Sequence, residues 1–190
     1  MKTEIEVKAK IANNDVLMSA LTRLGCTFGD PISQDDMVYG EKTGTLEEFL
    51  SNDVFLRIRI RGDGKIILTA KQPTKKSAEH LVKIEHEVEV SSHLEARAIL
   101  KMMGYSPMVR VKKIRRIAHF HEYEICIDEI EGLGAFIEIE VIGESENADT
   151  IQAEMGTFLE SLGIATESQV KKGYDILMLE TLATSFAHTK

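Results

Sequence analysis

The chain of 190 residues is 43% hydrophobic and 28% charged, a composition typical of globular domains and unlike that of disordered, collagenous or disulfide-rich chains. Its length predicts one domain over residues 1–190, because single domains usually span roughly 100 to 200 residues. With 23 basic against 31 acidic residues, the formal net charge is -8, which argues against general binding to nucleic acid or to an anionic membrane, so any polyanion site must be local.

From the N-terminus, the first elements we expect are a strand and a helix. Glutamates alternate with Ile and Val over residues 4–7, which is the two-residue period of a strand. Asn13 or Asn14 then provides the N-cap of a helix that carries apolar residues at helical spacing and ends at Gly25. The chain therefore begins with a strand followed by an amphipathic helix.

The next two strands form a predicted hairpin. Residues 55–61 alternate apolar residues with three arginines, so the arginines share one face of the strand. The Gly-Asp-Gly sequence at 62–64 supplies a turn, and residues 65–71 return as the second strand. The hairpin therefore presents a row of cationic side chains on one side.

Four more strands and three more helices complete the expected order. Alternation predicts the strands, whereas serine caps, apolar spacing and terminal glycines predict the helices. In chain order they are a strand over 83–90, a helix between Ser91 or Ser92 and Gly104, strands over 109–117, 123–128 and 135–141, a helix over 148–162 and a helix after Gly173. We expect the four helices to cover the apolar face of the strands.

Charged residues occupy one face of these strands, and Ile, Val and Leu occupy the other. The charged set comprises Glu4, Glu6, Lys8, Arg57, Arg59, Lys71, Glu85, Glu87, Lys113, Arg115, Asp128, Glu138 and Glu140. If the apolar face packs against helices, the charged face either lies in water, as in an open sheet, or lines the lumen of a closed barrel. Periodicity alone does not choose between these two arrangements.

Two Glu-x-Glu pairs are candidate ligands for a divalent metal ion. Side chains two residues apart on a strand point the same way, about 6.6 Å apart. Glu4 with Glu6, and Glu138 with Glu140, therefore form two carboxylate pairs. Like charges held close favour a bound cation, and hard oxygen ligands suit magnesium or manganese. For either pair alone, a solvated strand face carries more weight, because charged residues are mostly exposed.

The basic residues of the same face are candidates for phosphate binding, because their side chains can donate charge-assisted hydrogen bonds to phosphate oxygens. The set is Lys8, Arg57, Arg59, Lys71, Lys113 and Arg115. Together with metal-binding carboxylates, these cations would form a metal-dependent triphosphate site. An alternative of equal weight is that the acidic and basic groups form cross-strand salt bridges, which contribute little at a surface.

The sequence favours a cytoplasmic protein with reduced cysteines. The first ten residues lack the apolar run of a signal peptide, and no stretch approaches the roughly 20 apolar residues of a membrane span. Cys26 and Cys126 are far apart and outside any C-x-x-C pair, so we expect both to be buried thiols. Neither nucleic acid nor a membrane is an expected partner.

These residues fall into motifs that resemble the CYTH family, the triphosphate tunnel enzymes that include class IV adenylyl cyclases and thiamine triphosphatases. The family hallmark E-x-E-x-K stands at residues 4–8. It is followed in family order by LRIR at 56–59, LTAK at 68–71, KIR at 113–115, Asp128 and LGAFIEIE at 133–140. The match extends to about residue 179, where GYDIL at 173–177 is similar to the closing tyrosine-containing segment of class IV cyclases.

The resemblance implies an α+β fold in which an eight-stranded antiparallel β-barrel encloses a charged tunnel and helices pack outside. Mg2+ or Mn2+ would be held by Glu4, Glu6, Glu138 and Glu140, with Asp128 nearby. The triphosphate would be bound, and its reaction promoted, by Lys8, Arg57, Arg59, Lys71, Lys113 and Arg115. The expected substrate-binding set is completed by Lys83, Glu85 and Glu87, with Lys83 standing where many members carry arginine.

The resemblance leaves two mechanisms for a triphosphate substrate such as ATP or tripolyphosphate. A cyclase directs the ribose 3′ hydroxyl at the α-phosphorus, whereas an inorganic or thiamine triphosphatase directs water at the γ-phosphorus. The overall length and the segments around Lys113 and Tyr174 favour a class IV-like adenylyl cyclase that converts ATP to cyclic AMP and pyrophosphate. Triphosphate hydrolysis is the alternative, and a non-catalytic polyphosphate- or nucleotide-binding module is the second alternative. The cyclase resemblance also suggests a homodimer.

Overall fold

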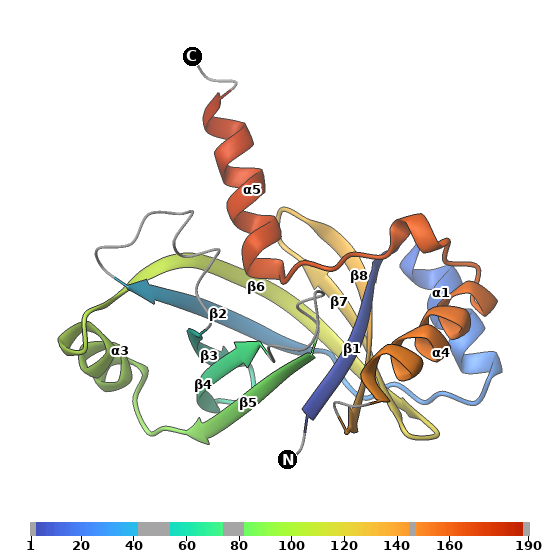
Figure 1. Ribbon diagram of the computed structural model, residues 1–190, viewed down its shortest axis with the longest axis horizontal. Helices are drawn as coiled ribbons and strands as arrows, with labels where there is room; N and C mark the ends of the chain where they lie inside the picture. The colour runs from blue at the N-terminus through green and yellow to red at the C-terminus, as the bar shows by residue number, and fades with distance from the viewer. Residues whose placement is uncertain (1–2, 42–53, 74–81, 145–146, 188–190) are drawn as a thin grey trace.

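The computed structural model describes residues 3–41, 54–73, 82–144 and 147–187, and within them eight strands close into an antiparallel barrel (Figure 1). The order around the barrel is β1-β5-β4-β3-β2-β6-β7-β8, and β8 pairs with β1 to close it. The strands are β1 Thr3–Lys10, β2 Ile32–Glu41, β3 Phe55–Arg61, β4 Ile66–Pro73, β5 Val82–Glu89, β6 Tyr105–Phe120, β7 Tyr123–Ile130 and β8 Gly134–Gly143. The barrel implied by the family resemblance is confirmed.

The four predicted helices are also confirmed. They are α1 Asn14–Arg23, α3 His93–Met102, α4 Ala148–Ser161 and α5 Tyr174–Ala187, with a short 3-10 helix, η2, at Thr166–Ser168. The Asn13 side chain accepts a hydrogen bond from the backbone N–H of Val16 at 3.1 Å, and Ser92 accepts one from Glu95 at 3.2 Å. Asn13 and Ser92 are therefore the N-caps of α1 and α3. Of the helices in the described ranges, none combines the length and apolar character that crossing a bilayer requires.

The main hydrophobic core lies outside the barrel, between its wall and the helices α1 and α4 (Figure 1). Val7 of β1 and Ile139 of β8 pack there with Leu21 of α1 and with Met155 and Leu159 of α4. Burying a side chain of this size stabilises a fold by about 1.5 to 3 kcal/mol. Because β1 and β8 are paired neighbours, this packing also fixes the two strands that carry the Glu-x-Glu pairs.

A smaller apolar cluster supports the opposite wall of the barrel. Ala96 and Leu100 of α3 pack against Tyr39 of β2 and Ile58 of β3, and all four side chains are buried. In Figure 1, α3 lies on the far side of the barrel from α1 and α4. Since side chains alternate along a strand, outward packing of Ile58 directs its arginine neighbours into the lumen.

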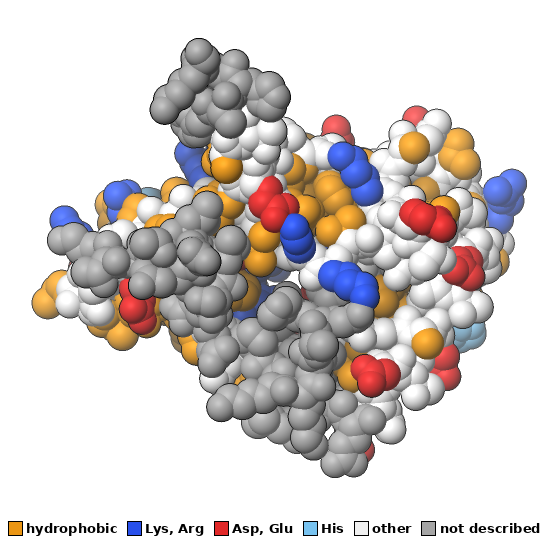
Figure 2. Space-filling model, turned by 45° about the horizontal axis from the view of Figure 1, so that its top comes forward, with side chains coloured by type: hydrophobic (Ala, Val, Ile, Leu, Met, Phe, Trp, Pro, Cys, Tyr) orange, Lys and Arg blue, Asp and Glu red, His pale blue; other side chains and the backbone are white. Residues whose placement is uncertain are grey.

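The helix α5 does not join the outer layer that the sequence suggested. Its first residue, Tyr174, is buried with Val111, Ile130 and Phe136 of the barrel strands, and the half-buried residues 175–179 follow it. The later part of α5 is exposed and projects from the barrel (Figure 1). Apolar residues occur all round α5, so its sequence does not indicate which face is buried. On the surface, apolar side chains gather at the foot of this helix (Figure 2).

The strand β2 is the element that sequence patterning did not reveal. Its sequence places Asp35 and Asp36 side by side, which interrupts the alternation of charged and apolar residues. Burial nevertheless alternates, because Gln34, Asp36 and Val38 are buried on the tunnel side. β2 pairs with β3 on one edge and with β6 on the other, so the backbone groups on both of its edges form hydrogen bonds within the barrel.

Candidate active site

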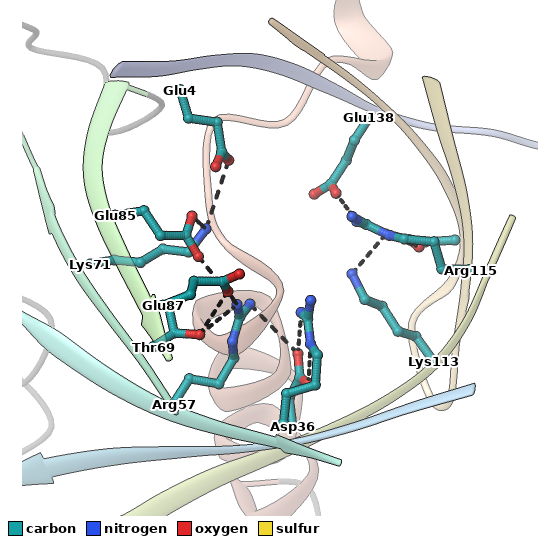
Figure 3. A network of polar contacts seen from close by, with 12 residues as sticks. Glu4, Asp36, Arg57, Thr69, Lys71, Glu85, Glu87, Lys113, Arg115 and Glu138 are labelled. Atoms are coloured by element: carbon teal, nitrogen blue, oxygen red, sulfur yellow. Dashed lines mark hydrogen bonds and ion pairs between the residues drawn. The ribbon is translucent and has the colours of Figure 1, made fainter. Parts of the chain in front are cut away.

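The barrel encloses a cavity of about 370 Å³, within the size range of ligand sites. Of the charged residues that the sequence singled out, the cavity is lined by Glu4, Glu6, Lys8, Arg57, Arg59, Lys71, Glu85, Glu87, Lys113, Arg115, Glu138 and Glu140. Figure 3 looks into this cavity and shows acidic and basic side chains pointing inward from strands all round the barrel. Residues far apart in the sequence therefore meet in one enclosed space.

Asp128 anchors the basic side chains of β6. Arg115 donates hydrogen bonds to both carboxylate oxygens of Asp128, from Nε at 2.7 Å and from Nη2 at 2.6 Å, and Lys113 Nζ donates at 3.0 Å. Burial alone would raise the pKa of Asp128, which is 0% exposed, but the charges of Lys113 and Arg115 lower it. Asp128 thus holds these two cations in place.

Glu138 links the cations of two strands. Lys8 Nζ lies 3.0 Å from Glu138 Oε1, and Arg115 Nη2 donates to Glu138 Oε2. Burial would raise the pKa of Glu138, yet Lys8 and Arg115 hold it well below its usual range. Of the carboxylates that the resemblance implies as metal ligands, Asp128 and Glu138 are therefore engaged with cations, and Glu6 also lies 3.4 Å from Lys8 Nζ.

Asp36 of β2 holds two of the three arginines of β3 (Figure 3). Arg59 donates to both carboxylate oxygens, from Nε at 2.7 Å and from Nη2 at 2.8 Å, while Arg57 Nη1 lies 3.8 Å from Oδ2. Burial alone would raise the pKa of Asp36, but the hydrogen bonds from Arg59 and the charge of Arg57 lower it to about 2. Arg57 also donates to Glu85 at 3.3 Å and to Glu87 at 3.1 Å.

Lys71 connects the arginine wall to the acidic side of the cavity. Its Nζ lies 2.5 Å from Glu85 Oε2 and 3.7 Å from Glu4 Oε1. Burial would raise the pKa of Glu85, but the charge of Lys71 lowers it to about 2. Glu85 is therefore an ionised partner of Lys71 and Arg57.

Glu4, Glu6 and Glu140 form the group best suited to a metal ion. Each offers one carboxylate oxygen, and the three oxygens lie within 4.8 Å of one another. Burial raises the pKa of Glu4 to about 9 and that of Glu140 to about 7, since Lys71 and Arg115 only partly offset it. Hard oxygen donors crowded together in a buried site suit Mg2+ or Mn2+. These three residues therefore fit a divalent ion.

Tyr174 lies against two of the cavity's ammonium groups. Lys8 Nζ is 4.3 Å and Lys113 Nζ is 4.9 Å from the centre of its ring, within the range of cation–π attraction. The ring of Phe136 meets Tyr174 edge-on at 5.2 Å, which fixes the position of the aromatic ring. The first residue of α5 thus helps to orient two cations that come from different strands.

Several polar residues of the cavity were not among the predicted site residues, namely Gln34, Asp36, Arg61, Glu124 and Asp175. Gln34 and Asp36 were missed because β2 was missed, whereas Glu124 alternates with Cys126 and Asp128 in a predicted strand and could have been found by that pattern. Glu124, Cys126 and Glu140 also bring potential ligand atoms within 4.8 Å of one another.

Two smaller sequence predictions concern Lys83 and the cysteines. The backbone of Lys83 pairs with Glu4 in the barrel, but its side chain lies outside the described residues, so its role stays a prediction. Cys26 and Cys126 are buried free thiols, as expected.

Asp36→Asn is expected to lower the free energy of unfolding by about 2 kcal/mol near neutral pH. The pKa of Asp36 falls from 3.8 to about 2 on folding, and each pKa unit corresponds to about 1.4 kcal/mol. A lowered carboxyl pKa stabilises the fold above pH ~3.8, and this stability is lost as the pH falls through the folded pKa. Urea unfolding from neutral pH down to about pH 2 should therefore show wild type and variant converging, and a pH-independent difference would contradict this role.

The chain is similar to known proteins over most of its length. Residues 2–174 match the family model of the CYTH domain. A Methanocaldococcus jannaschii protein named as a candidate adenylate cyclase is 31% identical over 172 residues, which cover 90% of this chain and 95% of that protein. The solved PH1819 protein of Pyrococcus horikoshii is 26% identical, with a TM-score of 0.79, over 93% of this chain and 99% of its own. A Hippeastrum protein, described as a candidate adenylyl cyclase with a dominant triphosphatase activity, shares the fold at 18% identity and a TM-score of 0.60, over 91% of both chains.

Proposed function

The chain belongs to the CYTH family, and from this premise we propose that it is a metal-dependent triphosphate-processing enzyme that converts ATP to cyclic AMP and pyrophosphate. The observation that carries the proposal is the meeting of cations and crowded carboxylates in one enclosed cavity. The proposed phosphate-binding cations are Lys8, Arg57, Arg59, Lys71, Lys113 and Arg115. The name of the Methanocaldococcus relative supports cyclisation as the reaction.

The basic side chains would bind the phosphate chain without first having to be ordered. Asp128 holds Lys113 and Arg115, and Asp36 holds Arg59. Donors that are fixed before the substrate arrives lose little conformational entropy and need no rearrangement as charge develops in the transition state. Each charged hydrogen bond to a phosphate oxygen would contribute about 1.5 to 3 kcal/mol.

Glu4, Glu6 and Glu140 would hold the divalent ion, Mg2+ or Mn2+. When bound there, the ion would supply positive charge to the phosphate oxygens and so favour phosphoryl transfer. Lys71 lies 3.7 Å from Glu4 and would place a phosphate-binding ammonium group directly beside this cluster. The carboxylates and the cations of the cavity would therefore act on the same phosphate chain.

Hydrolysis at the γ-phosphorus is the second candidate function. The same cations and carboxylates would serve a water nucleophile, because phosphoryl transfer depends mainly on positioning and electrostatic stabilisation. The Hippeastrum protein, which has the same fold, is described with a dominant triphosphatase activity. A non-catalytic binding module would need the cations but would not need the three crowded carboxylates.

The products of the purified protein test these alternatives. The protein is incubated with ATP, tripolyphosphate or thiamine triphosphate and with Mg2+ or Mn2+, and the products are separated by chromatography. Cyclic AMP with pyrophosphate supports the cyclase, whereas free phosphate without cyclic AMP replaces it by a triphosphatase. Triphosphate binding without any product would reject catalysis. The Glu4→Gln variant, purified in the same way, controls for contaminating enzymes.

A further inference from the structure

We propose that Gln34 and Arg61 together hold the hydroxyl group or water molecule that attacks the phosphate chain. The inference deepens the proposed function and rests on it. Both side chains line the cavity. Gln34 of β2 and Arg61 of β3 are also direct partners in the register of the two strands, which places their side chains next to each other.

The Gln34 side chain is the first observation that points to a ligand. Gln34 is only 4% exposed, and its Oε1 has no hydrogen-bond partner among the described residues. The buried acids Asp36, Asp128 and Glu138 of the same barrel each bind a cation. Buried polar atoms nearly always have a hydrogen-bond partner, because a buried donor or acceptor without a hydrogen bond destabilises the fold. An acceptor left open in this cavity therefore indicates a position where a bound group donates a hydrogen bond.

Arg61, the register partner of Gln34, supplies an open donor on the neighbouring strand. Its Nε is buried and makes no hydrogen bond within the part of the chain that the structure describes. The other end of the guanidinium is held by Asp63, whose Oδ2 lies 2.9 Å from Nη2. Asp63 therefore orients Arg61 from the turn between β3 and β4 and leaves Nε available.

The turn that carries Asp63 packs closely against β2. The N–H of Gly62 donates to the carbonyl oxygen of Ser33 at 2.8 Å, and a Cβ at Gly62 would lie 2.5 Å from Ser33 Oγ. A side chain at position 62 would therefore force the Ser33 hydroxyl to turn away, while the Ser33 backbone N, at 3.5 Å, would be in ordinary contact. The close contact fixes the end of β3 against the beginning of β2 and thereby keeps Arg61 beside Gln34.

An open acceptor beside an open donor selects for a particular kind of group. An ionised phosphate offers only acceptors and would satisfy Arg61 but not Gln34, and a hydrocarbon would satisfy neither. A hydroxyl group or a water molecule donates to Gln34 and accepts from Arg61 through one oxygen atom. In the proposed reactions, the group of this kind is the nucleophile, either the ribose 3′ hydroxyl or water.

The role of the pair is to align the nucleophile and not to remove its proton, because an amide oxygen is a poor base at neutral pH. In the reaction, the nucleophile's oxygen bonds to phosphorus while the bond from phosphorus to the bridging oxygen breaks. The phosphate chain beyond that oxygen leaves with the bonding electrons, and the proton of the nucleophile passes to solvent. A nucleophile held in line for this displacement reacts faster, and a misplacement of about 1 Å can reduce the rate about 100-fold.

The substitution Gln34→Met tests this assignment, because methionine has a similar shape but no strong acceptor. We expect the kcat for ATP or tripolyphosphate to fall roughly 100-fold. The Kd for tripolyphosphate, measured by calorimetry, should stay within about twofold, because the ionised phosphates do not use Gln34. The Tm of the substrate-free protein should be unchanged or higher, since an unpartnered buried amide has been removed. The matched control is Gln72→Met, on an exposed residue of β4, which should change none of these values.

Arg61→Lys provides an independent test, because it keeps the charge but removes the Nε donor. It should also lower kcat more than it weakens tripolyphosphate binding. If Gln34→Met and Arg61→Lys both retain the wild-type kcat, the inference is wrong while the proposed function stands. Weaker tripolyphosphate binding at unchanged kcat would also overturn it, because the pair would then be phosphate ligands. A wild type that binds triphosphates without turnover would instead reject the proposed function.

Discussion

Asp128→Asn should lower the free energy of unfolding by about 3 to 5 kcal/mol, the usual cost of removing one partner from a buried ion pair. Asp128 is 0% exposed and accepts hydrogen bonds from Arg115 and Lys113. Asparagine keeps the volume of the side chain but has no charge. The two buried cations would therefore lose the negative charge that now balances part of theirs. Because the same two cations are proposed to bind the triphosphate, we also expect turnover to be lost.

A matched surface pair provides the control for Asp128→Asn. Asp35 accepts from Arg110 with the same two-pronged geometry, at 2.7 and 2.5 Å, but Arg110 is 53% exposed. Asp35→Asn should therefore cost less than about 1 kcal/mol, as is usual for exposed ion pairs. Urea denaturation of both variants gives the comparison. Equal losses of stability would contradict the prediction, because the buried ion pair of Asp128 would then contribute no more to stability than the exposed pair of Asp35.

Glu4→Gln should reduce metal-dependent kcat/KM by at least roughly 100-fold, a loss of the size seen when one electrostatic group is removed from an active site. Glu4 supplies one of the three carboxylates that we propose as metal ligands. The stability of the metal-free protein should hardly change, because burial raises the pKa of Glu4 to about 9 and so keeps the carboxyl neutral at pH 7. Glutamine is neutral as well and has nearly the same shape.

Activity measured over a range of Mg2+ or Mn2+ concentrations tests the Glu4 prediction, and thermal unfolding without metal tests its stability part. Glu129→Gln, on an exposed residue of β7, is the control and should retain full activity. Glu138→Gln is expected to differ from Glu4→Gln, because Glu138 is an ionised partner of Lys8 and Arg115 and its loss should also destabilise the fold. Wild-type kcat/KM for Glu4→Gln at saturating metal would exclude Glu4 as a ligand.

Regular alternation and clear caps account for the parts of the fold that the sequence predicted. Residues 55–61 alternate without a break and form β3 over the same range. β2 escaped detection because Asp35 and Asp36 are both charged yet point to opposite sides of the sheet. Asp36 pairs with Arg59 inside the barrel, and Asp35 pairs with Arg110 on the outside. Because a charged residue is stabilised by an arginine on each side of the sheet, the sequence of β2 does not show the alternation of charged and apolar residues that is typical of a strand.

Alternation placed the charged residues on one face, but it could not say which acid meets which cation. That depends on the register between strands. Lys8 lies opposite Glu138 in the pairing of β1 with β8, whereas Glu6 lies opposite Glu140. Glu138 consequently becomes the partner of a lysine, while Glu140 joins the carboxylate cluster, although the two glutamates are neighbours on one strand face.

The lumen of the barrel has a consequence for the thermodynamics of unfolding. Charged groups fill a space that most small domains fill with hydrocarbon, and the apolar packing lies outside the strands. Exposing apolar surface raises the heat capacity on unfolding, whereas exposing polar surface lowers it. The heat capacity increment should therefore be small for a chain of this length. A small increment flattens the dependence of stability on temperature, so the barrel should weaken only gradually on both heating and cooling.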